Sequence, residues 1–168
     1  MASDWPPSGK DSRMSGVTIV GPSLGAAPLC EPILRALPRW FGIPEATAQY
    51  IRDIDTMPTL TALKNEICLG FLALRRFGKF AADIHVMGVM PDCHHQGFGR
   101  HLVTAAEAFL AREGVEYLQV KTLSPSRSDA NYDLTRRFYL ALGFRPLDEF
   151  PTLWGEANPC LQLIKKIK

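Results

Sequence analysis

The segment Met90-Pro-Asp-Cys-His-His-Gln-Gly-Phe-Gly-Arg-His-Leu-Val103 decides the fold of this chain. It follows an apolar run typical of a strand, contains two glycines one residue apart, and continues into an amphipathic helical pattern. A strand, turn and helix in this order leave unpaired backbone N–H groups at the positive end of the helix, where a phosphate can dock. We therefore expect this turn to hold the phosphates of a cofactor.

Composition and charge set the limits on function. A chain of 168 residues fits one domain with a substantial core, and 46% hydrophobic with 21% charged residues is ordinary for a globular protein. The formal net charge of +2 and the lack of a basic stripe argue against a nucleic-acid partner. No apolar run reaches the roughly 18–20 residues of a membrane span, so no membrane partner is expected.

The cysteines and the N-terminal residues bear on location. Cys30, Cys68, Cys93 and Cys160 lie far apart without a C-x-x-C pair, which favours a reducing, cytoplasmic setting. Residues 1–16 mix Pro, Ser, Asp and Lys without a hydrophobic stretch, so they predict a flexible leader rather than a secretory signal. The domain proper is expected over residues 17–168.

Hydrophobic periodicity, with Pro and Gly as breaks, predicts seven strands and four helices in the order β-α-α-β-β-β-α-β-α-β-β. Hairpins combined with one β-α-β crossover indicate an α/β fold with a mixed sheet and helices on its faces. The expected strands are 17–20, 59–63, 67–74, 81–89, 115–123, 144–150 and 160–167, and the expected helices are 29–41 (interrupted by Pro38), 45–55, 99–113 and 130–142.

Two motifs in this order resemble the GCN5-related N-acetyltransferase (GNAT) superfamily. His94-His-Gln-Gly-Phe-Gly99 is similar to the family's [Q/R]-x-x-G-x-[G/A] pyrophosphate loop, with His94 where Gln or Arg is usual. Thr135-Arg-Arg-Phe-Tyr-Leu-Ala-Leu-Gly-Phe144 is similar to its F-Y-x-x-x-G-F segment. The closing Leu153-Trp-Gly and Asn158-Pro-Cys resemble a bacterial subgroup of unknown acceptor. The resemblance implies a mixed, mostly antiparallel twisted sheet of about seven strands flanked by four helices.

The same resemblance implies an activity. It predicts an acetyl-CoA-dependent N-acetyltransferase that moves an acetyl group directly to a primary amine within a ternary complex. The acceptor would be a small-molecule or peptide amine, and a homodimer is a further expected partner because dimers are common in the family. A non-catalytic acyl-CoA-binding or sensing module on the same fold is the alternative.

The cofactor residues surround the turn and the strand before it. Glycines let a diphosphate approach the backbone, and the resemblance places coenzyme A on the loop amides and a pantetheine arm beside the strand residues 87 and 89. A nicotinamide turn fits less well, since the third glycine of G-x-G-x-x-G and the later acidic residue are missing. The residues expected to bind the cofactor are Met87, Val89, His94, His95, Gln96, Gly97, Phe98, Gly99, Arg100 and, more weakly, Asn131.

Tyr139 is the expected general acid. Leu134, Phe138 and Ala141 form the stripe assigned to the core, and Tyr139 lies off that stripe. A phenol can give a proton to a leaving thiolate, and the resembled family has its acid at this tyrosine. A half-buried structural tyrosine at a helix–sheet edge is the competing interpretation.

Asp83 and His85 are the candidates for the general base. Strict alternation would put Asp83, His85 and Met87 on one face of their strand and the apolar residues between them on the other. A carboxylate or imidazole there, directly or through water, can accept the proton of the attacking amine. Both side chains could instead serve only as structural hydrogen-bonding groups.

Three aromatic residues are expected to border the acceptor: Trp154 in the last interstrand connection, and Trp40 and Tyr50 from the first two helices. Core packing is the alternative for each. The His and Cys residues near the turn lack the spacing of a zinc site, so no metal is expected. Direct transfer also requires no cysteine nucleophile.

Overall fold

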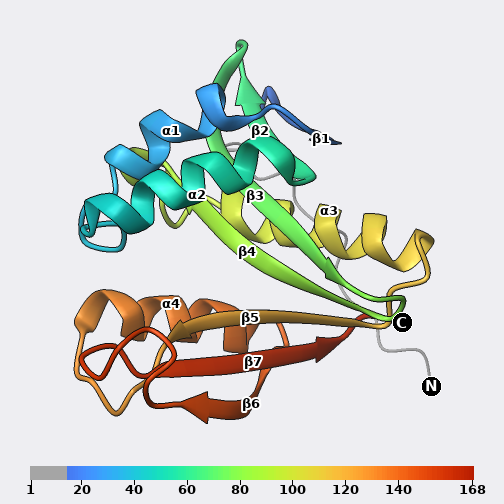
Figure 1. The fold of residues 1–168 in the computed structure, drawn as a ribbon. Coiled ribbons are helices and arrows are strands. Elements are labelled where there is room, and N and C mark those ends of the chain that lie inside the picture. The colour runs from blue at the N-terminus through green and yellow to red at the C-terminus, as the bar shows by residue number, and fades with distance from the viewer. Residues whose placement is uncertain (1–14) are drawn as a thin grey trace, which may run out of the picture.

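The computed structural model describes residues 15–168, and Figure 1 shows a strongly twisted sheet with helices on both faces. The element order predicted from the sequence is confirmed, as is the seven-stranded sheet with four helices. All but the last two residues of the expected leader lie outside the described residues. The elements are β1 Val17–Ser23, α1 Ala27–Arg35, α2 Pro44–Thr56, β2 Thr59–Lys64, β3 Ile67–Phe77, β4 Ala81–Val89, the 3₁₀ helix η2 Pro91–Cys93, α3 Phe98–Arg112, β5 Tyr117–Leu123, α4 Ala130–Ala141, β6 Arg145–Phe150 and β7 Cys160–Lys166.

The sheet has the strand order β1-β2-β3-β4-β5-β7-β6, and every neighbouring pair is antiparallel except β4 and β5. That parallel pair is short. It runs only from Ala81 opposite Tyr117 to Ile84 opposite Val120. Beyond this point β4 and β5 diverge, as Figure 1 shows, so the second half of each strand has one edge free of a strand partner.

Two apolar clusters cover the two faces of the sheet. Helices α1 and α2 pack on one face, where Ile33 and Ile54 meet Phe71 of β3 and Val86 of β4. Helix α3 packs on the opposite face, with α4 beside β5. Helix α1 ends at Arg35 rather than near residue 41, because Pro38 restricts the residue before it and cannot donate to the helix. Among the described residues, no helix has the length and apolar character needed to cross a membrane.

The strict alternation expected along β4 is wrong. Leu74 of β3 pairs with Ile84 while the next residue back, Ala73, pairs with Val86, so β4 carries one extra residue at His85. This bulge turns Val86 to the α1/α2 face, whereas Ile84 and Met87 belong to the opposite cluster. A bulge bends its strand and increases the local twist, and this one lies where β4 leaves β5.

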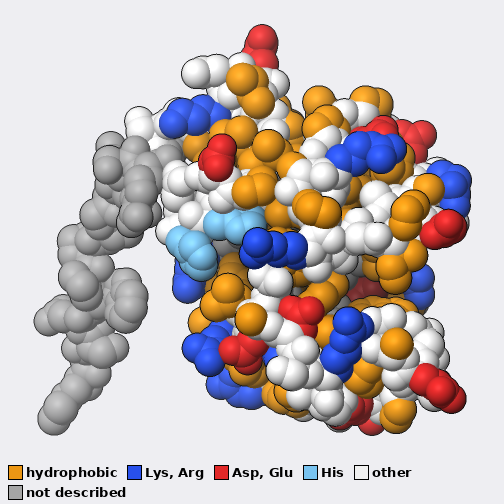
Figure 2. Space-filling view, turned by 90° about the vertical axis from the view of Figure 1, so that its left-hand side faces the viewer, with side chains coloured by type: hydrophobic (Ala, Val, Ile, Leu, Met, Phe, Trp, Pro, Cys, Tyr) orange, Lys and Arg blue, Asp and Glu red, His pale blue; other side chains and the backbone are white. Residues whose placement is uncertain are grey.

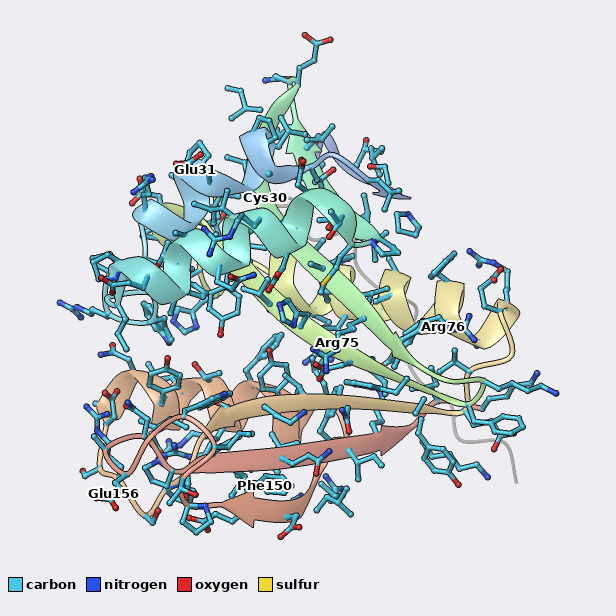
Figure 3. The ribbon with its side chains drawn as sticks, in the orientation of Figure 1. Cys30, Glu31, Arg75, Arg76, Phe150 and Glu156 are labelled. Atoms are coloured by element: carbon cyan, nitrogen blue, oxygen red, sulfur yellow. The ribbon has the colours of Figure 1, made fainter. Side chains whose placement is uncertain are left out.

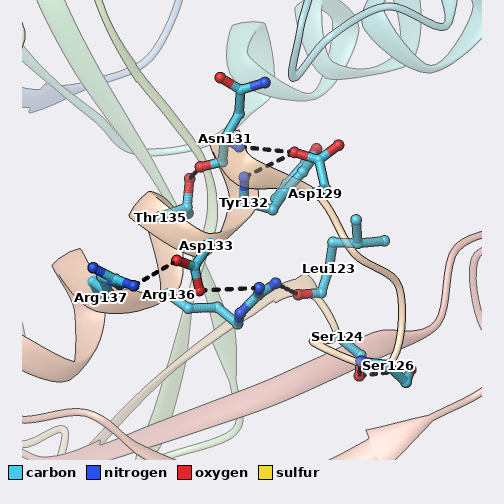
Figure 4. Close-up of polar contacts among 10 residues, drawn as sticks. All are labelled: Leu123, Ser124, Ser126, Asp129, Asn131, Tyr132, Asp133, Thr135, Arg136 and Arg137. Atoms are coloured by element: carbon cyan, nitrogen blue, oxygen red, sulfur yellow. Dashed lines mark hydrogen bonds and ion pairs between the residues drawn. The ribbon is translucent and has the colours of Figure 1, made fainter.

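The core stripe expected on α4 is also wrong. Leu134 is 51% exposed and Ala141 is exposed, whereas Tyr139 is 5% and Arg136 8% exposed. Arg136 reaches under the helix and donates to the Leu123 carbonyl at 2.7 Å, so a charged side chain occupies part of the packed face (Figure 4). Leu134 and Phe138 both line a cavity, where Leu134 is exposed and Phe138 packs against the edge of the core.

Candidate active site

Helix α3 begins with unsatisfied donors. Its N-cap residue, Gly97, has φ +91° in the left-handed region and supplies no side chain to the first turn. The first helical bond is donated by His101 to the Gly97 carbonyl at 3.0 Å. The N–H groups of residues 98–100 therefore have no intrahelical acceptor, and they coincide with the positive end of the helix dipole. This end of α3 is suited to bind an anion.

The two glycines of the turn have different roles. Gly97 provides a backbone conformation that residues with a side chain rarely adopt. A Cβ added at Gly99 would lie 3.0 Å from Cζ of Phe138, so Gly99 permits α3 to pack closely against α4. Gly99 therefore has a packing role at the contact between α3 and α4, and the expectation that both glycines let a diphosphate approach the backbone stays a prediction.

Histidines flank the turn. Nε2 of His94 lies 2.8 Å from the Val89 carbonyl oxygen, and the His94 ring lies edge-on to Trp40 with centroids 5.9 Å apart. His95 has φ +60° and is exposed. Gln96 donates to the Asp92 carbonyl at 2.6 Å, so its side chain closes the turn locally. Figure 2 shows histidines and a neighbouring cationic side chain gathered beside the hollow between the two halves of this face.

The free edge of β4 presents main-chain groups. The Met90 N–H donates to the Leu69 carbonyl of β3 at 2.8 Å, and strand groups alternate in direction, so the N–H groups of Met87 and Val89 point away from β3. The Val89 carbonyl agrees with this direction, because it accepts from His94 rather than from β3. Two main-chain donors therefore face the space where β4 and β5 diverge.

Two cavities open on either side of this divergence. The first, here called the strand cavity, has a volume of about 650 Å³ and lies over β4 and β5 between α2 and the β6–β7 connection. The second, the loop cavity, has a volume of about 700 Å³ and lies between the turn at 94–100 and α4. The residues that line both cavities are Trp40, Phe41, Met87, Thr135 and Tyr139.

Tyr139 lies where the cavities meet. Its ring packs between Phe138 and Phe144, with centroid distances of 5.1 and 5.5 Å, and only 5% of the residue is exposed. Burial, with a smaller contribution from the Asp83 carboxylate, raises the pKa of the Tyr139 phenol above its usual value. The phenol therefore stays protonated at neutral pH, which a proton donor requires.

Asp83 and His85 both line the strand cavity, but in different environments. Asp83 is 6% exposed and its Oδ1 has no hydrogen-bond partner. Burial raises the pKa of its carboxyl to about 6, although nearby cations, Lys121 foremost, lower it. His85 lies at the bulge, and its Nε2 is 2.8 Å from Oδ2 of Asp53 on α2. Gln49 donates to the other Asp53 oxygen at 2.7 Å, so this carboxylate is fixed from two sides.

Aromatic residues connect the two halves of the molecule above the cavities. The indole N–H of Trp40 donates to Oγ1 of Thr135 at 3.1 Å, and the Tyr132 hydroxyl donates to the Trp40 carbonyl at 3.1 Å. Burial is the main cause that raises the pKa of Tyr132 to about 12, so the phenol remains a donor. These bonds join the α1–α2 connection to α4. Tyr50 packs edge-on to His85 at 5.6 Å, and Trp154 lines the strand cavity at 40% exposure.

The structure brings most of the predicted site residues together. The strand cavity holds the predicted base candidates and acceptor aromatics, and the loop cavity holds Val89 and the turn residues except Gln96. Gln96 and Asn131 line neither cavity, and Asn131 is occupied at its main chain by the Asp129 cap and by Thr135. Sequence reasoning missed four polar residues that contact or line the strand cavity: Asp53, Arg75, Lys121 and Thr122.

Residues 15–168 contain no group of three or more His, Cys, Asp or Glu side chains placed to hold a metal ion. The four cysteines are unpaired thiols in the structure. The site therefore consists of titratable side chains, main-chain donors and two adjoining cavities.

Comparison with known structures gives the fold a name. A protein from Desulfovibrio desulfuricans described as a GNAT-family acetyltransferase matches with TM-score 0.78 and 17% identity, over 90% of this chain and 99% of that one. The ribosomal-protein-S18-alanine N-acetyltransferase of Escherichia coli matches with TM-score 0.70 and 20% identity, over 90% and 94%. A GNAT acetyltransferase from Elizabethkingia anophelis, solved with acetyl-CoA bound, matches with TM-score 0.69 and 17% identity, over 90% and 98%.

At these identities the solved structures establish a shared fold. The comparison with curated proteins gave no match. The family model of the acetyltransferase (GNAT) family, however, matches residues 30–144, which include both cavities' central residues and the two motifs. The membership that those motifs predicted is confirmed, and this chain belongs to the acetyltransferase (GNAT) family.

Proposed function

We propose that this GNAT-family acetyltransferase moves an acetyl group from acetyl-CoA to a primary amine by direct transfer, with both substrates bound at once. The observation that carries the proposal is the junction of the two cavities at Tyr139. One cavity begins at the uncapped start of α3, and the other contains the base candidates. A molecule in each would meet beside the phenol.

The loop cavity fits coenzyme A. The diphosphate would bind the free N–H groups at the start of α3, with His94, His95 and Arg100 near its charge. The main-chain donors of Met87 and Val89 would bind the amide-containing arm along the free edge of β4, as a neighbouring strand would. When bound, acetyl-CoA supplies an acyl thioester, whose sulfur can depart as a thiolate. The similar structure that holds acetyl-CoA supports this assignment.

The residues around the junction would accept one proton and donate another. The acceptor amine must lose one before its lone pair can form the new C–N bond, and Asp83, His85 or a water held by them would accept it. The C–S bond breaks, and the Tyr139 hydroxyl would give its proton to the departing sulfur. Donors at Met87 and Val89 would stabilise negative charge on the carbonyl oxygen.

The contact with Asp53 supports His85 as the base. When the imidazole is neutral, a proton on Nε2 would be donated to the Asp53 carboxylate, which leaves Nδ1 with the lone pair. The carboxylate would also stabilise the cation that forms after proton transfer, which is the role of an orienting acid beside a catalytic histidine. Asp83 remains the alternative base, because its raised pKa of about 6 lies close to neutrality.

Replacing Tyr139 by Phe tests the proposal. We expect Tyr139→Phe to lower turnover of acetyl-CoA with an amine by at least roughly tenfold to a hundredfold, since it removes the general acid. Affinity for coenzyme A should stay within about twofold, because the ring and its packing remain. Free-thiol release measures the first quantity and calorimetry the second. Tyr117→Phe, which removes an exposed phenol on β5, is the control.

The same assay distinguishes the acetyltransferase from the alternative function. A non-catalytic acyl-CoA-binding module would bind acetyl-CoA but release no thiol with any amine, and Tyr139→Phe would change nothing. Unchanged turnover in Tyr139→Phe would instead remove Tyr139 as the acid while leaving the transferase proposal to be judged by the thiol release itself.

A further inference from the structure

Two cations converge at one end of the strand cavity. Arg75 on β3 and Lys121 on β5 both line it, and both lie over the ring of Phe77, with the guanidinium carbon 4.5 Å and the ammonium 5.8 Å from the ring centroid. Figure 3 shows Arg75 directed across the sheet face between β4 and β5, whereas its neighbour Arg76 lies toward the end of α3. Two like charges held near one ring repel each other, and an anion between them would offset this repulsion.

The surrounding charges leave these cations incompletely matched. Asp83, opposite Arg75 in the β3–β4 register, supplies the one carboxylate that lines the cavity. Among residues 15–168 neither Arg75 nor Lys121 takes part in an ion pair within 4.0 Å, although other Arg and Lys side chains do. The lining therefore carries two permanent cations and one carboxylate, while the Asp53 carboxylate lies outside the lining and is held by His85 and Gln49.

Unpartnered polar atoms point to a ligand in the same place. Within the described part of the chain, Oδ1 of Asp83 and Oγ1 of Thr122 are the two buried side-chain polar atoms without a hydrogen-bond partner, and both residues line the strand cavity. Buried polar groups in folded proteins are nearly always paired, so two orphans in one cavity indicate a polar molecule that completes them. They offer it an acceptor and a hydroxyl.

The position of the cations relative to the junction sets the shape of that molecule. Asp83, beside Arg75, lies four residues before Met87 on β4, which corresponds to roughly 12 Å along a strand, so an amine beside Met87 and Tyr139 would have His85 rather than Asp83 as its base. A molecule with its nitrogen at the junction and its anion near Arg75 must therefore have several bonds between the two groups. The long side chains of Arg75 and Lys121 can reach toward the anion, which shortens the separation that the molecule must span.

We propose that the acceptor is a small amine that also carries an anionic group, with its nitrogen beside Tyr139 and His85 and its anion bound by Arg75 and Lys121. This inference rests on the proposed acetyltransferase function and names its substrate class. A polyamine or an aminoglycoside, with several positive charges, would be repelled by the same two side chains. A carboxylate and a phosphate can each accept hydrogen bonds from a guanidinium and an ammonium. The proposed acceptor therefore carries an anionic group of either kind.

Matched acceptors test it. For each of several chain lengths, the ω-amino acid, the alkylamine and the α,ω-diamine differ only in a terminal group that is negative, neutral or positive, and an ω-aminoalkyl phosphate gives the phosphate comparison. We expect kcat/KM for acetyl transfer to be about tenfold or more higher for the anionic acceptor than for the neutral one of equal length, and lowest for the diamine. The faster of the carboxylate and phosphate series identifies the anion.

Variants locate the preference on the two side chains. Arg75→Gln and Lys121→Gln should each lower kcat/KM for the anionic acceptor about tenfold more than kcat/KM for the neutral alkylamine of equal length. Lys121→Glu should make the diamine the better substrate. Arg76→Gln is the matched control, because Arg76 donates to the Lys79 carbonyl and lies near Glu113 on the other face.

The outcomes of these experiments distinguish a failure of the proposed substrate class from a failure of the proposed acetyltransferase function. If neutral amines or diamines are acetylated as well as anionic ones, or if Arg75 and Lys121 variants affect all acceptors equally, the substrate class is wrong while the transferase stands. If acetyl-CoA releases no thiol with any acceptor, both proposals fall.

Discussion

Helices α3 and α4 begin differently, although both stand beside the same cavity. Asp129 caps α4 and accepts the N–H groups of Asn131 and Tyr132 at 2.9 and 3.1 Å (Figure 4). Gly97 begins α3 and has no side chain to offer. The first turn of α4 is thus paired internally, whereas the first turn of α3 keeps its donors for another molecule. The helix start with the weaker cap is the one suited to the cofactor.

The comparison extends to side chains. Asp53 has both carboxylate oxygens bonded within the protein, and Asp129 and Glu149 each have one, whereas Oδ1 of Asp83 has no partner. Within residues 15–168, the two buried side-chain polar atoms that the fold leaves unpaired, on Asp83 and Thr122, both belong to residues that line the strand cavity. A molecule bound in this cavity would satisfy both atoms, which would explain why the fold tolerates them without partners.

Giving α3 the kind of cap that α4 has should produce the largest effect. Gly97→Asp places a carboxylate among the donors and beside a diphosphate, so we expect affinity for coenzyme A to fall on the order of a thousandfold, about 4 kcal/mol. Calorimetry measures it. Gly97→Asn, which tolerates the left-handed backbone nearly as well but carries no charge, should lose far less. Equal affinities for Gly97→Asp and wild type would exclude the start of α3 as the phosphate site.

The second largest effect is expected at Asp83, the buried carboxylate with an unpaired oxygen. Its folded pKa of about 6 lies above the usual 3.8, so the native state binds more protons than the unfolded state between these values, and stability falls as pH rises through that window. Above pH 6 the penalty is complete. Asp83→Asn should therefore raise the free energy of unfolding at pH 7 by up to ~3 kcal/mol and at pH 3 by little. Urea denaturation at both pH values measures it, and an equal change at both would contradict it.

Gly99→Ala examines the contact that holds the two helices together. The added methyl would lie 3.0 and 3.1 Å from the Phe138 ring, so we expect a loss of about 2 kcal/mol in stability from overpacking. Combining it with Phe138→Leu should recover part of that loss if the clash is the cause. Thermal unfolding of the three variants reports this, and an undiminished loss in the double variant would place the cause elsewhere.

Removing the cap of α4 should give the smallest change. Asp129→Ala frees two N–H groups and is expected to cost about 1 kcal/mol of folding stability, with coenzyme A affinity within about twofold of wild type. Asp129→Ser, which can still cap, should retain most of the stability. Denaturation measures the folding stability of both variants, and calorimetry on the same samples measures their affinity for coenzyme A. A large loss of affinity would mean that the two helix starts do not have the separate roles described here.

Local signals explain how much of this fold was predictable. Proline, glycine and apolar periodicity act over a few residues, so the order of eleven strands and helices was predicted, as was the turn at 94–100. Asp129 caps α4, and Asp is among the residues preferred at the start of a helix. The two motifs then led to the family, because their order and spacing are carried by the same local elements.

Features that depend on partners across the fold were not predictable. The bulge at His85 arises from register against β3, and it moved Val86 to the opposite face from that expected. The α4 stripe failed because apolar Leu134 and Phe138 line a cavity while Arg136 is buried by a bond to Leu123. Asp53, Arg75 and Lys121 come from three separate elements, and no sequence spacing connects them.

A structure of the complex with coenzyme A tests the central claim most directly, through the distance from the coenzyme sulfur to the Tyr139 hydroxyl. The account predicts a separation within about 4 Å, with the diphosphate on the first turn of α3. A sulfur that lies well beyond hydrogen-bonding reach of Tyr139, or a diphosphate bound away from Gly97, would contradict it.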